Sequence, residues 1–252
     1  MEALNGNAWV TLCNWDQIPH LSESVKAELL ATYPEYQREA RSRGIPSLGS
    51  GAIYKIALED LVVPDMEIPD HWPRAYAMDV GWQRTACVHS ALNRDTDVLH
   101  IYSEHYRSEC EPIVHAEAIK SRGTWIKGSI DPAARGRGQI DGRNLLDMYR
   151  DLGLDLIPAD NAVESGIFQV WTRMSTGRLK IFKSCQNLQN ELRLYRRDER
   201  GKIVKTNDHL CDALRYLVME LHNLLSTKPV KEKEKPTSAW ASASSFSTGW
   251  MG

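Results

Sequence analysis

Two aspartates stand where an apolar strand ends, a position that suits metal chemistry. Asp79 closes the mostly apolar run 74–80, and Asp131 directly follows the run 125–130. A carboxylate at such a position is costly to remove from water unless it is paired or bound to a metal ion. The pattern therefore makes both aspartates candidate metal ligands.

A third acidic position opens the last helix expected in the chain. Asp208 and Asp212 are four residues apart and share one helix face, and His209 lies within reach of Asp212. A helical-wheel count puts both carboxylates opposite a stripe of leucines. We expect Asp212 to be the third metal ligand, with Asp208 and His209 assisting catalysis.

Such a set of residues suits the hydrolysis of a phosphodiester. Two Mg²⁺ or Mn²⁺ ions about 3.5–4 Å apart neutralise charge on the attacking and leaving oxygens of that reaction. These hard cations prefer oxygen ligands. The five cysteines are scattered and form no C-x-x-C pair, which argues against a zinc site. An imidazole beside the cluster either shuttles a proton or completes the metal shell, and the sequence leaves both roles open.

Each acidic residue also has a purely structural interpretation. Asp131 precedes Pro132 and can begin a turn, and Asp79 can cap its strand or pair with an arginine. Asp208 and Asp212 can lie on a solvated polar face, where Asp208 is also favourable near a helix N-terminus. The convergence of three separate segments is what favours the functional interpretation.

Basic residues gather in one part of the sequence. Between 178 and 205, nine basic residues stand against three acidic ones, a net charge of +6 in a chain whose formal charge is −2. Such a patch holds phosphate and carries little base information; the alternative is a basic surface hairpin that aids solubility. Glu191, one of the three acidic residues, is a further candidate near the site. The expected DNA contacts are Arg135, Arg137, Arg178, Lys180, Arg193, Arg196, Arg197, Arg200, Lys202 and Lys205.

The elements that must position these residues follow an α/β pattern. The sequence predicts strands at 74–80, 85–92 and 98–106, a helix at 112–121, a strand at 125–130, a helix at 141–152, a strand at 154–157, a helix at 162–174, a strand at 179–182, a strand and hairpin within 191–205, and a helix at 208–225. This order is that of a ribonuclease H-like fold: a mixed five-stranded sheet flanked by helices, here with an added basic β-hairpin. The first and fourth strands then lie side by side, which places Asp79 and Asp131 at neighbouring strand ends.

Composition divides the chain into three parts. Residues 1–70 form an irregular linker segment with one helix at 23–32, residues 71–227 form the nuclease-like domain, and residues 228–252 form a disordered tail rich in Lys, Glu, Ser and Ala. Apolar and charged fractions of 42% and 25% are typical of soluble globular proteins. There is no long apolar run or secretion signal, and no Gly-Lys-Ser/Thr loop, so we expect an intracellular protein without its own nucleotide-hydrolysing motor.

Several blocks resemble the nuclease half of bacteriophage terminase large subunits. They are DPAARGR at 131–137, NAVESGI at 161–167, GRLK at 177–180 and KTNDHLCDALRY at 205–216. Residues 15–21 and 40–54 are similar to the segment that joins the ATPase motor of those proteins to their nuclease. The resemblance covers nearly the whole chain except the tail.

The resemblance implies a ribonuclease H-like, resolvase-like endonuclease that cuts concatemeric viral DNA at the start and end of capsid filling, in the host cytoplasm. Its metal-binding acids match Asp79, Asp131 and Asp212, with Mg²⁺ or Mn²⁺ as cofactor, and His209 matches an accessory position. Double-stranded DNA, an ATPase motor domain or subunit, the portal and the small terminase subunit are the implied partners, with no membrane. The tail aromatics Trp240, Phe246 and Trp250 resemble portal-docking termini, with plain disorder as the alternative.

Two other functions remain open at this point. A junction-resolving nuclease of recombination shares the fold and would prefer branched DNA. A non-catalytic DNA-binding packaging subunit would bind DNA but leave it intact in Mn²⁺.

Overall fold

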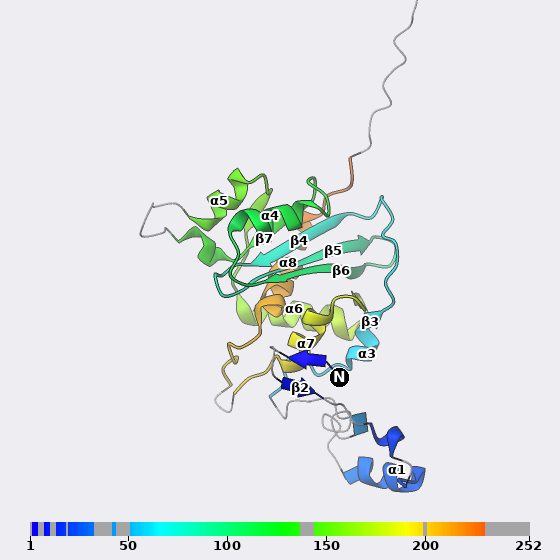
Figure 1. Cartoon of the computed structure of the whole chain (residues 1–252). Coiled ribbons are helices and arrows are strands. Elements are labelled where there is room, and N and C mark those ends of the chain that lie inside the picture. Colours follow the sequence, from blue (N-terminus) through cyan, green and yellow to red (C-terminus); the bar gives the residue numbers. More distant parts are fainter. Residues whose placement is uncertain are drawn as a thin grey trace, which may run out of the picture.

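The fold is a mixed β-sheet with helices on both faces (Figure 1). The computed structural model describes residues 2–4, 8–10, 14–18, 20–32, 42–43, 51–136, 144–198 and 201–229. The main sheet runs in the order β3-β9-β6-β5-β4-β7-β8. Its strands are β3 (Val62–Val63), β4 (Arg74–Asp79), β5 (Thr85–Asn93), β6 (Val98–Arg107), β7 (Lys127–Ile130), β8 (Leu156–Pro158) and β9 (Leu179–Phe182).

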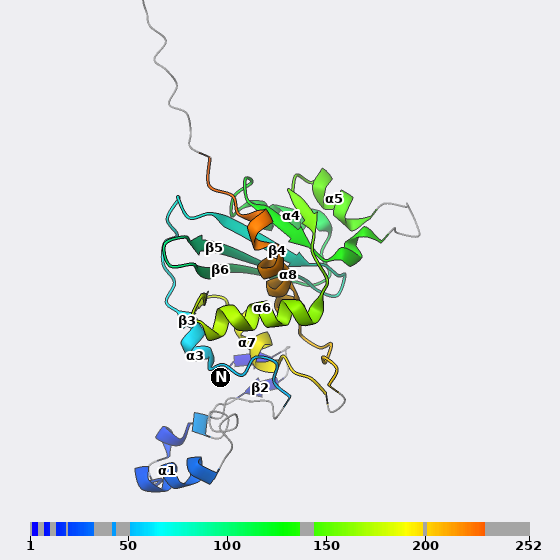
Figure 2. The same cartoon turned by 180° about the vertical axis from the view of Figure 1, so that it is seen from behind.

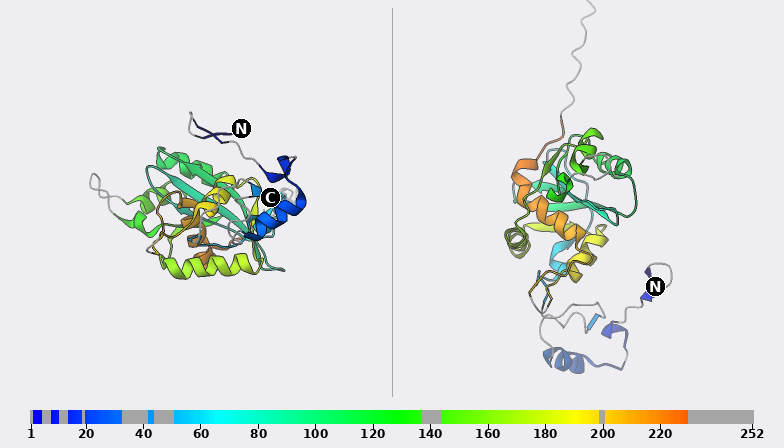
Figure 3. Two further views of the ribbon diagram at one scale, coloured as in Figure 1. Left: turned by 90° about the horizontal axis from the view of Figure 1, so that it is seen from below. Right: turned by 90° about the vertical axis from the view of Figure 1, so that its left-hand side faces the viewer.

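Two layers of helices cover the sheet. Helices α4 (Pro112–Lys120) and α5 (Leu145–Asp151) lie on one face, and α6 (Val163–Ser175), α7 (Gln186–Leu194) and α8 (His209–Leu224) lie on the other (Figures 1 and 2). A view along the sheet shows α8 lying directly against the strands (Figure 3). The middle of strand β4, residues 75–78, is apolar because its two faces pack against different helices. Ala75 and Ala77 pack with α8, whereas Tyr76 and Met78 pack with α4 and α5.

The ribonuclease H-like class is confirmed, and the sheet is larger than predicted. Strand β9 pairs in parallel with β6, and the two-residue strand β3 pairs with β9, so the sheet has seven strands among the described residues instead of five. The helices expected at 23–32, 112–121, 162–174 and 208–225 are present to within one residue at each end. They are α1 (Glu23–Thr32), α4, α6 and α8.

The predicted strand beginning at Glu191 is wrong. That residue lies in helix α7, whose Leu188 and Leu192 are one turn apart and pack into the core beneath β6 and α8. The helix begins at residue 186 and its first core leucine is Leu188, so a hairpin that starts at 191 takes in half of the helix. The hairpin is present but shorter than predicted: Arg197 bridges Ile203, the Asp198 N–H donates to the Lys202 carbonyl at 2.7 Å, and the Val204 N–H donates to the Arg196 carbonyl at 3.0 Å.

Smaller elements precede the sheet. They are β1 (Glu2–Leu4), β2 (Ala8–Val10), the short 3₁₀ helix η1 (Trp15–Gln17) and α3 (Leu58–Leu61); a second 3₁₀ helix, η2 (Pro132–Arg135), follows β7. Of the helices in the described part of the chain, none has the length and apolarity needed to span a membrane. The tail from residue 230 onward, with Trp240, Phe246 and Trp250, lies outside the described residues.

Candidate metal centre

Asp79 and Asp131 lie at neighbouring strand ends. Strands β4 and β7 are parallel, with Met78 opposite Ile130, so the residue that follows each pair member is one of the two aspartates. The Asp131 backbone N–H donates to the Met78 carbonyl at 3.0 Å and carries the pairing one step past the end of β7. The carboxyl ends of both strands thus present an aspartate at the same edge of the sheet.

Asp131 is also held locally. It caps η2, where its Oδ1 accepts from the Ala133 backbone N–H at 3.0 Å, and Pro132 occupies the first turn. The turn-forming role that the Asp-Pro sequence suggested is therefore present. It fixes the direction of the carboxylate through Oδ1.

Helix α8 brings the remaining acids to this edge. It packs against β4, β5 and β7 and against α6 and α7, so it is surrounded by protein. Asp208 and Asp212 are only 6% and 8% exposed. The solvated polar face considered for them does not exist, because residues on the side opposite the leucines are covered as well.

Tyr216 joins the strand ends to α8. Its hydroxyl donates to Asp131 Oδ1 at 3.3 Å. The pKa of Tyr216 is raised by burial and then by the negative charges of Asp131 and Asp212, with a smaller contribution from Asp79. Tyr216 is thus in contact with Asp131, and it lies one helix turn after Asp212 on the same face of α8.

Asp79 and His209 form a pair across the sheet–helix boundary. His209 Nδ1 lies 2.8 Å from Asp79 Oδ2. The hydrogen bond to Asp79 raises the pKa of His209, against the opposing effect of burial. Burial raises the pKa of Asp79; His209 opposes the rise, whereas Asp131 and Asp212 add to it through like-charge repulsion. The pair links the end of β4 to the first turn of α8.

Asp212 is held between two cations. Its Oδ2 lies 3.0 Å from Lys205 Nζ, and its Oδ1 lies 3.2 Å from an Arg215 guanidinium nitrogen. Lys205 also lies 3.1 Å from Asp208 Oδ2. Arg215 is 1% exposed, and it fits only because position 166 is glycine: a Cβ on Gly166 would lie 2.3 Å from Arg215 Cγ.

Glu191 supports the start of α8. No side chain of the helix caps its own N-terminus, and Glu191 does so from α7: its Oε2 accepts from the backbone N–H groups of Leu210 at 2.6 Å and Cys211 at 3.2 Å. Its Oε1 accepts from the Tyr106 hydroxyl at 2.7 Å. Glu191 is therefore near the site as expected, and its contacts position α8.

The predicted DNA-contacting residues fall into separate groups. Arg178 and Lys180 flank the start of β9, which is paired with the start of β6; this is the opposite end of the sheet from Asp79. Arg178 is ion-paired with Asp97 at 2.9 Å. The basic residues of 178–205 therefore lie in at least two separate places. The residues on the path from α7 into α8 are Arg193, Arg196, Arg197, Lys202 and Lys205.

Arg135 is exposed at the end of η2, close in sequence to Asp131. Arg137 and Arg200 lie outside the described residues. An exposed aromatic residue near Asp79 was not predicted: Trp82, three residues after Asp79, is 65% exposed. Arg84 lies 4.4 Å from the centre of the Tyr106 ring in the same loop region.

The chemistry of the donors suits a divalent cation of the Mg²⁺ or Mn²⁺ type. Asp79, Asp131, Asp208 and Asp212 offer hard oxygen ligands. Two of these oxygens are buried and ion-paired: Asp208 Oδ2 with Lys205, and Asp212 Oδ1 with Arg215. As they stand, no three His, Cys, Asp or Glu side chains of the described residues are close enough to hold one ion. The carboxylates are instead engaged by Lys205, Arg215 and His209.

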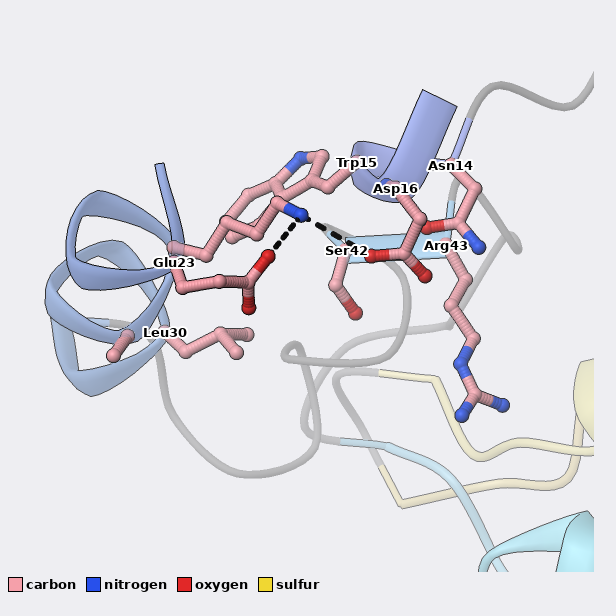
Figure 4. Close-up of a pocket in the computed structure, with 9 residues that line it drawn as sticks. Asn14, Trp15, Asp16, Glu23, Leu30, Ser42 and Arg43 are labelled. Atoms are coloured by element: carbon pink, nitrogen blue, oxygen red, sulfur yellow. Dashed lines mark hydrogen bonds and ion pairs between the residues drawn. The ribbon is translucent and has the colours of Figure 1, made fainter. Parts of the chain in front are cut away.

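A hollow elsewhere in the chain lacks this acidic cluster. It lies between η1, α1 and residues 42–43 (Figure 4). Lys26 crosses it to contact Glu23 at 2.6 Å and Asp16 at 3.3 Å. Because its acids are already paired with this lysine and are exposed, the hollow is a poor candidate for catalysis.

Comparison with known proteins identifies similar chains. Residues 76–221 match the family model described as a terminase RNaseH-like domain. The chain is 37% identical over 205 residues to the large terminase subunit of Salmonella phage P22, an alignment that covers 78% of this chain and 41% of that protein. The chain thus spans about two fifths of the length of the curated relatives it matches.

Solved structures give the same picture. The P22 large terminase nuclease domain superimposes with a TM-score of 0.65 at 33% identity, covering 71% of this chain and 96% of that one. The nuclease domain of the SPP1 large terminase, solved with bound Mn, has a TM-score of 0.50 at 13% identity and covers 67% of this chain and 99% of that one. The second likeness concerns the fold alone.

Proposed function

Since the chain belongs to the family of terminase RNase H-like domains, we propose that it is a divalent-metal-dependent endonuclease that cuts concatemeric viral DNA during genome packaging. In this proposal residues 71–227 are the nuclease domain, residues 1–70 are the connector to a motor, and residues 228–252 are a tail. The motor is an ATPase domain or subunit outside this chain. The portal and the small terminase subunit are further partners in this proposal, and the host cytoplasm is the location.

The observation that carries the proposal is that Asp79 and Asp131 end neighbouring parallel strands, and that both contact α8, which carries Asp212 in its first turn. Carboxylates that repel one another are retained in one place when a cation is to be bound there. Asp79, Asp131 and Asp212 would hold Mg²⁺ or Mn²⁺. When bound, a pair of such ions neutralises charge on the attacking and leaving oxygens of the phosphodiester. The SPP1 nuclease domain, which binds Mn, supports this choice of metal.

The protein's own groups orient this centre. His209 Nδ1 lies 2.8 Å from Asp79 Oδ2, and this contact orients that carboxylate. Tyr216 fixes Asp131 through a hydrogen bond to Oδ1. Arg215 holds Asp212 from the protein interior. Asp208, one turn from Asp212, adds negative charge at the entry of α8.

The DNA-binding surface in this proposal is formed by Arg135 and the basic residues that lead into α8: Arg193, Arg196, Arg197, Lys202 and Lys205. Backbone contacts of this kind give affinity that falls steeply with salt and little sequence preference. Arg178 and Lys180 are left out, because they lie at the other end of the sheet. Arg137 and Arg200 remain expected contacts.

Plasmid nicking in Mn²⁺ tests the proposal. We expect the 252-residue chain to nick supercoiled DNA, and Asp131→Ala to lower the rate by at least about 100-fold, because loss of a metal ligand exceeds the 10- to 100-fold cost of losing its outer partners. Asp95→Ala, an exposed turn aspartate, is the matched control and should cleave like wild type. Equal cleavage by wild type and Asp131→Ala ends the active-site assignment. Strong preference for a four-way junction over linear duplex would favour a junction resolvase instead.

A further inference from the structure

Lys205 lies within the acidic cluster, and its position suggests a role beyond gripping DNA. Its Nζ is 3.1 Å from Asp208 Oδ2 and 3.0 Å from Asp212 Oδ2, so a single ammonium bridges two carboxylates one helix turn apart. We propose, as an extension of the metal-dependent nuclease function above, that Lys205 is a built-in counter-ion that neutralises the cluster before metal binds and is displaced by the metal.

The geometry places Lys205 on the side from which a metal ion arrives. The side chains of Asp208 and Asp212 are 8% and 11% exposed, whereas that of Lys205 is 63% exposed. Asp212 therefore faces a buried cation, Arg215, through Oδ1 and a solvent-side cation, Lys205, through Oδ2. An ion that reaches Asp212 from water meets the ammonium first.

The chain is shaped to make this contact. Asn207 has a positive φ of 52°, a backbone conformation that asparagine tolerates better than most residues. The turn folds the preceding residues back over the first turn of α8, where the Lys205 contacts are made. Because a lysine stem is long and flexible, the ammonium can leave the carboxylates without moving the backbone.

Two cations cannot both sit against Asp212 Oδ2. An ammonium and a divalent ion repel each other at contact distance, so their occupancies of this oxygen are negatively coupled. Displacement frees Lys205 on the segment that carries Arg196, Arg197 and Lys202, where its charge becomes available to a DNA phosphate. Metal binding and binding of the DNA backbone are thereby linked through the Lys205 side chain.

Calorimetric titration with MnCl₂ on the whole chain, without DNA, tests the inference. We expect Lys205→Met to bind Mn²⁺ about tenfold more tightly than wild type, inside the about 5- to 150-fold range of typical coupling between two ligands. Lys202→Met removes the same charge three residues earlier in the chain and is the control; its affinity should match wild type. Unchanged or weaker binding by Lys205→Met overturns the inference.

An Asp131→Asn arm separates this inference from the proposed function. If Asp131→Asn binds Mn²⁺ like wild type, or wild type does not bind it, the metal centre itself is wrong. If binding depends on Asp131 but is indifferent to Lys205, only the counter-ion role fails.

A second measurement uses the unaltered chain, so it does not depend on the folding of a variant. In ¹⁵N-lysine-labelled protein, the Lys205 ammonium signal, assigned by its loss in Lys205→Arg, should move to the position of a solvated lysine as Mg²⁺ is added. An ammonium signal that stays in place at saturating Mg²⁺ contradicts displacement.

Discussion

At the scale of single residues, the candidate metal ligands are held in place by side chains that α8 and the segment before it supply. Asp79 and Asp131 stand out because each ends an apolar strand. Nothing in the spacing of Tyr216 or Lys205 indicates that they contact Asp131 and Asp212, since those contacts depend on how α8 is docked against the sheet. Candidate ligands can therefore be recognised from the local sequence, whereas the tertiary contacts that hold them cannot.

Glu191 illustrates a positioning role that the sequence did not show. Replacing it with Gln keeps its shape but removes the charge that accepts from the first N–H groups of α8. We expect a loss of about 1–3 kcal/mol in the free energy of unfolding, measured in urea, because hydrogen bonds to a charged acceptor are stronger than neutral ones. Mn²⁺ affinity should fall as well, since α8 carries Asp212.

A matched control for this prediction is Tyr106→Phe. It removes the other hydrogen bond of Glu191 and leaves the cap in place, so it should lower stability with little change in Mn²⁺ affinity. If Glu191→Gln is as stable as wild type, the capping interpretation is wrong.

At the scale of elements, the spacing of apolar residues located most helices, but it misjudged helices that are covered by protein on both sides. The leucine stripe of α8 correctly marked a helix, but the wheel count implied a wet opposite face, and Asp212, Arg215 and Tyr216 are buried there. The helix is enclosed because α6 and α7 cover the side that the sheet does not. Helix α7 was missed because only two leucines of its stripe, Leu188 and Leu192, face the core, together with the polar Gln189 and Glu191.

Buried imidazoles in the central strands make the sheet sensitive to acid. His89 on β5 is fully buried and stacks with Tyr76 at 5.3 Å. Burial lowers its pKa to about 3, helped by Arg122 and His105, and burial lowers that of His105 on β6 to about 4. His105 is hydrogen-bonded to His115 on α4 at 2.8 Å.

The sign of the pH effect follows from these shifts. In the unfolded chain each histidine takes up a proton near pH 6.5, whereas in the folded protein it does not do so until far lower pH. Stability is therefore complete above pH 6.5 and falls as the pH drops toward 3–4, by up to about 1.4 kcal/mol per pH unit for each group.

His89→Phe tests this prediction. The variant should lose less stability than wild type between pH 7 and pH 4, measured as melting temperature against pH, because one of the buried bases is gone. His222→Phe alters an exposed histidine and should run parallel to wild type. Identical slopes for His89→Phe and wild type would show that His89 is not responsible.

At the scale of the whole molecule, the order of strands in the sheet brings together residues that are far apart in the sequence. The parallel pairing of β4 with β7 is what brings two aspartates 52 positions apart in the sequence to one edge. The right-handed crossover rule anticipated this neighbour relation. The seventh strand and the split of the basic residues between the two ends of the sheet were not anticipated, because both depend on β9 pairing with β6.

The segment before the sheet also reaches the site region. The Ile53 N–H donates to the Tyr195 carbonyl at 3.1 Å, Ala52 bridges Arg196, and the Tyr54 and Tyr195 rings stack at 5.8 Å. This part of the expected linker is thus packed against the chain that enters α8. Strand β3, at 62–63, also lies before the proposed boundary at residue 70, so the expected connector contributes a strand of the sheet as well as these contacts.

Anomalous diffraction from crystals grown with saturating MnCl₂ shows directly whether the three aspartates bind metal. We expect one or two manganese peaks within bonding distance of the carboxylates of Asp79, Asp131 and Asp212, and the loss of these peaks in Asp131→Asn crystals. A map with the three carboxylates still paired only to Lys205, Arg215, His209 and Tyr216, and with manganese absent or bound elsewhere, would contradict this expectation.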